Sequence, residues 1–337
     1  MSDNDAREPR STPALTRSLV LQTPITADQL PPVGPPLETV VVNADYGRRR
    51  PLAEEWELLA AYLRPHPHLE LKVRFSNKKP WDLEFLAPFG HLRKLWIDGT
   101  TPESMDGLHH VSQLRSLIIF DEGKRRSLEV LSQLTDLRSL VIAGNSRELD
   151  ALATLPNLRS LSLRGVKRDN LEFLGDAEQL GILTMDYGRI DDLSALAALP
   201  SLQMFGMGHT KPADLSPISR CSRLVRLILD HMPLTSFPDL SALAALKVIE
   251  AIELKGFEDL SPLATAPNVR YIAVDSKTLQ PGAFTVLAHH PTLEYLDAGL
   301  RNDALSYQPN QMLDLPRDVN HHYDKILAEL ADHIVDS

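Results

Sequence analysis

The chain has 337 residues, 43% of them hydrophobic, and a formal net charge of −10 at pH 7. This length and apolar fraction suffice to bury a large core. No apolar run reaches the roughly 18 residues that a membrane helix needs, and a single cysteine, Cys221, excludes an internal disulfide framework. Residues 1–36 show no apolar segment after a basic start, so no secretory leader is visible, and we expect a cytoplasmic protein.

The charge is unevenly distributed along the chain. Residues 1–170 hold 23 Lys and Arg against 22 Asp and Glu, whereas residues 171–337 hold 12 against 23. An electrically polar surface can orient a binding partner, although ordinary solubility explains the same asymmetry.

The N-terminal part is less regular than the rest. Residues 1–15 are polar and predicted to be a disordered tail. Residues 16–76 are predicted to form an N-terminal cap with strands near 16–21, 37–42 and 69–75. A helix is expected over residues 52–63, where Trp56, Leu59, Ala60 and Leu63 share one face.

Residues 77–300 repeat one apolar pattern, with leucines at three-residue spacing that end in Leu-x-Leu. The fourth apolar position of each copy recurs every 20 to 25 residues, at Leu92, Leu114, Leu137, Leu158, Leu180, Leu202, Leu224, Ile249, Val269 and Leu293. The Leu-x-Leu ending alternates like a strand with one buried face, and the three-residue spacing suits a 3₁₀ turn. A polar residue that can accept a helix-start hydrogen bond opens most copies: Asp82, Ser104, Ser127, Asn170, Asp192, Asp214, Asp239 and Asp259.

This pattern resembles the leucine-rich repeat family, in its 22-residue internalin and phosphatase-regulator form, over roughly residues 37–300. The resemblance implies an α/β right-handed solenoid, or horseshoe. Its parallel sheet would line the concave face and its short 3₁₀ or α turns the convex face. One departure is that the family's turn asparagine is present only at Asn145. Residues 301–337 are predicted to form a C-terminal cap, with a helix that carries Val319, Tyr323, Ile326, Leu330 and Ile334 on one face.

Strand residues between the buried leucines would face the concave surface. There Trp96, Ile118, Phe120 and Val141 are predicted to form an apolar patch, where the alternative is that a terminal segment or the curvature itself covers them. Basic residues frame it: Arg93, Arg115, Arg138 and Arg159 on one edge, and residues 48–50, 78–79, 124–126 and 167–168 on the other.

The C-terminal half of that surface reads as acidic and aromatic. Its predicted contact residues, which complete the partner-binding set, are Arg164, Asp186, Asp230, Glu253, Tyr271, Asp275, Tyr295 and Asp297. Lys255, between Asp230 and Asp275, is interpreted as part of a cross-strand charge ladder.

Tyr187, His209 and His231 occupy one turn position in successive copies and are expected to stack. Two imidazoles and a carboxylate could hold a metal, but a polar turn is the simpler interpretation. No phosphate loop, zinc-protease motif or nucleophile elbow occurs.

The sequence therefore predicts a non-enzymatic module, without cofactor or metal, that binds a partner protein through its concave face as a monomer. Nucleic acid is disfavoured by the negative charge. The alternatives are an immunity-like inhibitor of a basic toxin enzyme, a delivered effector and, remotely, a metal-dependent hydrolase.

Overall fold

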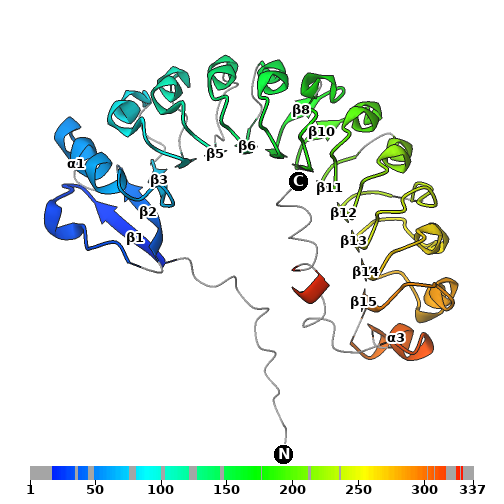
Figure 1. Cartoon of the computed structure of the whole chain (residues 1–337). Coiled ribbons are helices and arrows are strands. Elements are labelled where there is room, and N and C mark those ends of the chain that lie inside the picture. The colour runs from blue at the N-terminus through cyan, green and yellow to red at the C-terminus, as the bar shows by residue number, and fades with distance from the viewer. Residues whose placement is uncertain are drawn as a thin grey trace, which may run out of the picture. The chain divides into compact units, whose positions relative to one another are not determined.

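The computed structural model describes residues 17–34, 37–44, 49–75, 81–99, 103–120, 127–144, 148–175, 177–211, 214–234, 237–301, 303–306, 308–315, 324–326 and 328. The chain divides into two compact units, Met1–Gly123 and Lys124–Ser337. Figure 1 labels many of their strands and two of their α-helices.

The first unit is a parallel sheet with helices on one side. Its strands are β1 (Arg17–Gln22), β2 (Leu37–Asn43), β3 (Glu70–Arg74), β4 (Lys94–Asp98) and β5 (Ser116–Phe120), paired in chain order. The connections contain α1 (Ala53–Leu63) and the 3₁₀ helices η1 (Ala27–Gln29), η2 (Glu84–Phe89) and η3 (Asp106–Val111). The strands predicted near 16–21, 37–42 and 69–75 and the helix predicted over 52–63 are confirmed, and the role of this region as an N-terminal cap stays a prediction.

Helix α1 begins where a buried carboxylate gathers three donors. Glu55, which is 5% exposed, accepts the backbone N–H of Leu52 at 2.7 Å and of Ile25 at 2.5 Å, and the guanidinium of Arg49 at 2.5 Å. Leu52, the N-cap residue, has no side-chain acceptor, so the capping side-chain bond comes from Glu55, which accepts the Leu52 N–H. The predicted apolar face of α1 is buried, and the Trp56 ring stacks on Phe85 with centroids 4.6 Å apart.

The second unit repeats a strand and a short 3₁₀ helix or turn. Its main sheet has the order β6 (Ser139–Ala143), β7 (Ser160–Arg164), β9 (Ile182–Asp186), β11 (Met204–Gly208), β12 (Arg226–Asp230), β13 (Val248–Ile252), β14 (Tyr271–Asp275) and β15 (Tyr295–Gly299). A second, two-stranded sheet joins β8 (Lys167–Arg168) and β10 (Arg189–Ile190).

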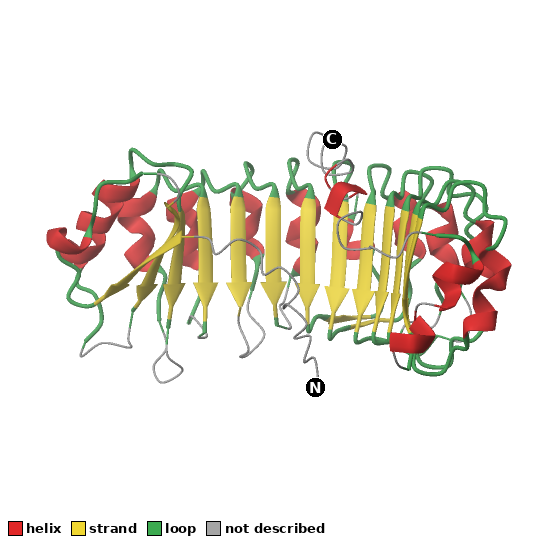
Figure 2. Cartoon of the chain, turned by 90° about the horizontal axis from the view of Figure 1, so that it is seen from below, coloured by secondary structure: helices red, strands yellow, loops and turns green. Residues whose placement is uncertain are grey.

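Short helices complete the second unit. They are η4 (Glu129–Gln133), η5 (Leu149–Thr154), η6 (Glu172–Leu174), η7 (Ser194–Ala198), η8 (Ser216–Arg220), η9 (Ser261–Thr265) and η10 (Pro281–Leu287), with α2 (Asp303–Ser306) and α3 (Gln308–Met312) after the last strand. In each unit the 3₁₀ helices lie on one face of the sheet (Figure 2). The opposite face, predicted to be concave, is called the open face below.

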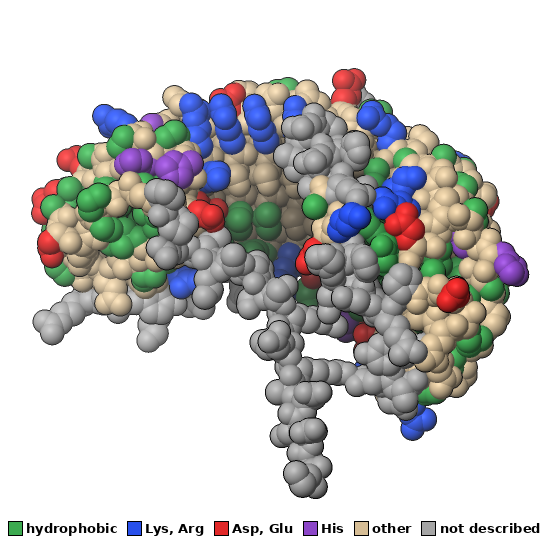
Figure 3. All heavy atoms as spheres, turned by 60° about the horizontal axis from the view of Figure 1, so that its bottom comes forward, with side chains coloured by type: hydrophobic (Ala, Val, Ile, Leu, Met, Phe, Trp, Pro, Cys, Tyr) green, Lys and Arg blue, Asp and Glu red, His purple; other side chains and the backbone are tan. Residues whose placement is uncertain are grey.

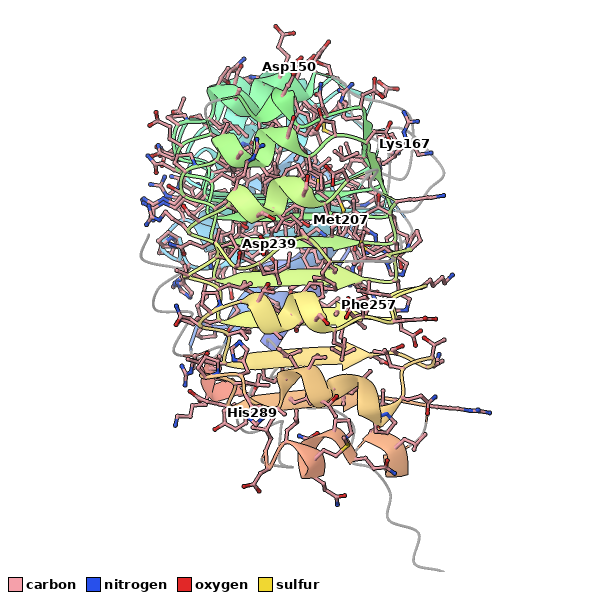
Figure 4. All side chains as sticks on the ribbon, turned by 90° about the vertical axis from the view of Figure 1, so that its right-hand side faces the viewer. Asp150, Lys167, Met207, Asp239, Phe257 and His289 are labelled. Atoms are coloured by element: carbon pink, nitrogen blue, oxygen red, sulfur yellow. The ribbon has the colours of Figure 1, made fainter. Side chains whose placement is uncertain are left out.

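The core of the second unit is a ladder of apolar side chains held in register. Leu161, Leu183, Phe205, Leu227 and Ile249 pair strand to strand, and each is 0% exposed. Burying one such side chain stabilises by roughly 1.5–3 kcal/mol, so the stack, and no single copy, holds the fold. Met207 and Phe257, marked in Figure 4, are also buried, whereas Asp150 and Lys167 are exposed.

The predicted polar residues at the start of each copy all accept a backbone N–H from the residue two positions later. The bonds run from Glu84 to Asp82, Asp106 to Ser104, Glu129 to Ser127, Glu172 to Asn170, Ser194 to Asp192, Ser216 to Asp214, Ser241 to Asp239 and Ser261 to Asp259. In Asp-Leu-Ser copies the serine hydroxyl also donates to the aspartate, as Ser194 does to Asp192 at 3.0 Å and Ser216 does to Asp214 at 2.5 Å. These three-residue loops are called clasps below.

The predicted register is wrong by three residues in one copy. Leu227 pairs with Ile249, so the anchor that matches Leu224 is Leu246 and not Ile249. The run Leu240, Leu243, Leu246 and Ile249 keeps three-residue spacing into the strand, and all four are 0% exposed, so apolar residues alone did not fix the register.

The predicted tail, residues 1–15, lies outside the described residues, and so do Val319, Tyr323, Leu330 and Ile334 of the predicted C-terminal helix. The segment boundaries at residues 15, 76 and 300 stay predictions.

Candidate protein-binding surface

On the open face of the first unit, three apolar side chains meet. Trp96 pairs across the sheet with Ile118, and Phe120 ends the neighbouring strand. The Trp96 and Phe120 rings meet edge to face, with centroids 5.7 Å apart. All three side chains point away from the leucine core and are partly exposed. The sequence analysis placed these three together, and the structure does the same.

A lysine that the sequence analysis left out of this patch lies against it. The Lys72 ammonium sits 2.8 Å from the centroid of the Trp96 ring and 3.4 Å from the Asp98 carboxylate, which Arg74 also contacts at 3.5 Å. Burial lowers the pKa of Lys72, and Asp98 partly offsets that shift. The sequence carried a signal for this contact, because Lys72 occupies the same strand position as Trp96 one copy earlier, where a cation can contact the ring.

Val141 lies on β6 in the second unit, where it pairs with Ser162 and is partly exposed. Its place in one patch with Trp96 stays a prediction.

The edge residues of this surface are only partly described. Arg93 donates to the carbonyl of Gln113 at 3.0 Å, and Arg115 and Arg138 are exposed. Lys and Arg side chains gather along a rim in Figure 3. The predicted basic residues 48, 78–79 and 124–126 lie outside the described residues.

In the second unit the expected ring stack is present. The Tyr187 and His209 rings lie 4.1 Å apart at 16°, and the His209 and His231 rings 4.7 Å apart at 9°. The Arg164 guanidinium lies 4.7 Å from the centroid of the Tyr187 ring. The stack therefore has a cation at one end.

The stack stands on left-handed backbone. Tyr187, His209 and His231 have φ of 53°, 49° and 47°, at the position where the two preceding copies have Gly144 and Gly165. Each backbone N–H still continues the sheet by donating to the end of the next strand, as His209 does to Asp230 at 3.0 Å. Ring stacking and this bond offset a conformation that costs bulky residues about 1–2 kcal/mol.

Each imidazole is bonded to its own carboxylate. His209 Nδ1 lies 3.0 Å from Asp186 and His231 Nδ1 lies 2.6 Å from Asp230. Asp186 can lean toward His209 because its partner on β11 is Gly208, where a Cβ would sit 3.1 Å from Asp186 Oδ1. Within the described residues no group of three His, Cys, Asp or Glu side chains is arranged to hold a metal ion.

The register error moves one predicted site residue, Glu253, and the predicted ladder residue Lys255. Glu253 is not on the strand: with φ 48° it takes the left-handed turn position that follows Tyr187, His209 and His231 in the next copy. Its carboxylate pairs with Lys277 at 2.9 Å, and this hydrogen bond lowers the pKa of Glu253. The strand position belongs to Glu250, which accepts from Arg226 at 2.7 Å. Ile252, and not Lys255, lies between Asp230 and Asp275, so the predicted charge ladder is wrong.

The predicted contact residue Tyr271 is buried. It is 3% exposed because Ile326, from the C-terminal segment, packs on it together with Val248 and Ala273. Tyr295, its partner on β15, is partly buried against the same cluster. Asp275 is partly exposed and Asp297 exposed. The sequence analysis expected this C-terminal segment to cap the last repeat. It considered cover by a terminal segment only at the Trp96 patch and did not foresee the contact at Tyr271.

None of the described helices is both long and apolar enough to cross a membrane. No family model matches the sequence, and the comparison with curated proteins gave no match.

Solved structures do resemble the fold. The internalin InlF of Listeria monocytogenes aligns with a TM-score of 0.57 at 20% identity, over 77% of this chain and 73% of its own. A chain of the mouse RP105/MD-1 complex aligns with a TM-score of 0.53 at 15% identity, over 80% of this chain and 53% of its own. At these identities the likeness concerns the fold. Together with the leucine register and the parallel sheet of each unit, it identifies the chain as a protein of the leucine-rich repeat fold.

Proposed function

We propose that the chain is a non-enzymatic module that binds a partner protein through the open face of its first unit. The observation that carries the proposal is the pair of Trp96 and Phe120 on a strand face turned away from the core. Aromatic side chains at such positions are the usual anchors of protein interfaces. The mouse RP105/MD-1 structure, one chain of which shares the fold, is a complex of two proteins.

Lys72 gives the patch a particular chemistry. Its ammonium is stacked under Trp96 and bonded to Asp98, so the outer surface is aromatic with a cation held beneath it. Because Lys72 is buried and paired with Asp98, the surface that Trp96 and Phe120 leave exposed suits a partner that offers apolar side chains. The single buried cysteine, Cys221, is compatible with the cytoplasmic location that the proposal includes.

The acidic residues of the second unit give little support to the inhibitor alternative. Asp186 and Asp230 are bonded to histidines, Glu250 to Arg226 and Glu253 to Lys277. An acidic surface whose charges are paired internally offers less to a basic enzyme than the sequence suggested.

The test compares partner capture by the native chain, Trp96→Ala, Phe120→Ala and the matched control Ser116→Ala, which lies on the same open face. Affinity purification from the native cell identifies the partner, and titration of that purified partner gives the affinities. We expect a loss of roughly 30-fold or more for each aromatic variant, as for interface anchors worth about 2 kcal/mol, and none for Ser116→Ala. Equal affinities in all four chains would refute this assignment.

A further inference from the structure

Part of the open face of the second unit is already occupied by the chain itself. Ile326 is 1% exposed and packs against Val248, Tyr271 and Ala273. The partly buried side chains of Val225, Ile252 and Tyr295 surround this contact.

Most of these strand residues belong to the face that is turned away from the leucine ladder. Tyr271 pairs with Val248 on one side and Tyr295 on the other, and Ala273 follows two residues later with its side chain on the same face. An apolar set at strand positions normally exposed to water is a surface built to be covered. Here the structure also shows what covers it.

The contact is narrow on the side of the C-terminal segment. Residues 324–326 and 328 are helical, and Asp324, Lys325 and Ala328 are exposed. Among the described residues of this segment, only Ile326 is buried. One aliphatic side chain in an apolar seat favours binding by roughly 10- to 100-fold, which is weak enough to be reversible.

We propose that the open face of β13 and β14 is a docking seat for an aliphatic side chain carried by a short helical segment, with the chain's own Ile326 segment as its resident occupant. A partner helix with the same chemistry must displace that segment. Because the Ile326 segment belongs to the same chain, it competes with a partner at an effective concentration on the order of millimolar. This competition sets the affinity that a partner must exceed. The inference draws on the proposed function only in assuming that the open face receives partners.

The seat can be tested without any partner. The probe is a fluorescein-labelled peptide of residues 319–334, titrated into full-length chains. Ile326→Asp empties the seat, and Ala328→Asp is the matched control because it adds the same charge at an exposed position of the segment. We expect Ile326→Asp to bind the peptide at least about tenfold more tightly than the native chain or Ala328→Asp does. A peptide that itself carries Ile326→Asp should not bind.

A second measurement reports on the seat directly. Acetylation of Tyr271 by N-acetylimidazole, read by mass spectrometry, should be slow in the native chain and in Ala328→Asp and faster in Ile326→Asp. Adding the native peptide should slow it again. Adding Ala273→Arg to Ile326→Asp should abolish peptide binding, because the new side chain fills the seat.

Equal peptide binding by all chains, or equal acetylation of Tyr271, would overturn the inference. Thermal unfolding of each variant separates loss of the seat from loss of the fold. The outcome is independent of the Trp96 and Phe120 test, because that test measures a partner on the first unit and this one measures the chain's own segment on the second.

Discussion

Replacing Glu55 by glutamine tests whether one buried carboxylate ties the first unit together. The carboxylate accepts from Ile25, Leu52 and Arg49, and glutamine turns one of its two oxygens into a donor that faces those donors. A hydrogen bond to a charged group is worth roughly 1.5–3 kcal/mol, and part of the set survives in glutamine. We therefore expect a loss of about 3 kcal/mol in the free energy of unfolding, or roughly a 10 °C drop in Tm for a unit of this size.

Tryptophan fluorescence during urea unfolding measures this loss selectively. All three tryptophans of the chain, at positions 56, 81 and 96, belong to the first unit. The matched control is Glu54→Gln, which removes the neighbouring exposed carboxylate of the same helix. Its free energy of unfolding should stay within about 0.5 kcal/mol of the native value.

The pH dependence provides a second check. Burial favours the protonated form of Glu55, but the bonds from Arg49, Leu52 and Ile25 outweigh it and lower the pKa of this carboxyl. Its stabilisation is therefore present above the unfolded-state pKa of about 4.3 and is lost as the pH falls through the lower folded value. The gap between the native chain and Glu55→Gln should narrow below about pH 4. Equal stability of the Glu55→Gln and Glu54→Gln chains at pH 7 would refute the reasoning.

Three further predictions concern the second unit. Gly188→Ala should unfold at a lower urea concentration than Gly282→Ala, because its Cβ would clash with the Val166 carbonyl oxygen whereas Gly282 has open space around it. Hydrogen bonds from the serine two residues later lower the pKa values of three clasp aspartates, Asp214, Asp239 and Asp259. The free energy of unfolding should therefore fall as the pH drops through their folded pKa values, below about 4. Replacing all three by Asn should flatten this pH dependence. Burial raises the pKa of Cys221 to about 11, so Ellman's reagent at pH 8 should label it only after denaturation, and rapid labelling of the native chain would contradict its buried placement.

The fold could be predicted because the sequence of each copy contains the signals that fix its register. Leucine spacing marks which strand residues point inward, and an Asp or Ser marks where the next turn begins, as at Asp192 and Asp214. Both signals are local, so they survive without knowledge of tertiary contacts. The prediction failed at Ile249 because Leu246 and Ile249 are both buried and both fit the spacing.

The candidate site was predictable where it depends on neighbouring strands. The contact of Trp96 with Phe120 and the stack of Tyr187 on His209 follow from equivalent positions in adjacent copies. The cover on Tyr271 did not, because Ile326 lies outside the repeat and its position depends on how the chain returns to the sheet. Periodicity says which residues a repeat leaves free, but it does not say what arrives there later in the chain.

The clasps have a consequence for how such a chain can grow or shrink. Each clasp closes within its own three residues, and Asp192 and Asp214 hold their serines in the same way one copy apart. Excision of residues 192–213 would therefore join two equivalent junctions and leave every remaining loop intact. Duplication of that stretch would add one copy by the same logic. Length can thus change by whole copies through recombination at the clasps, while the open-face residues of each copy diverge independently.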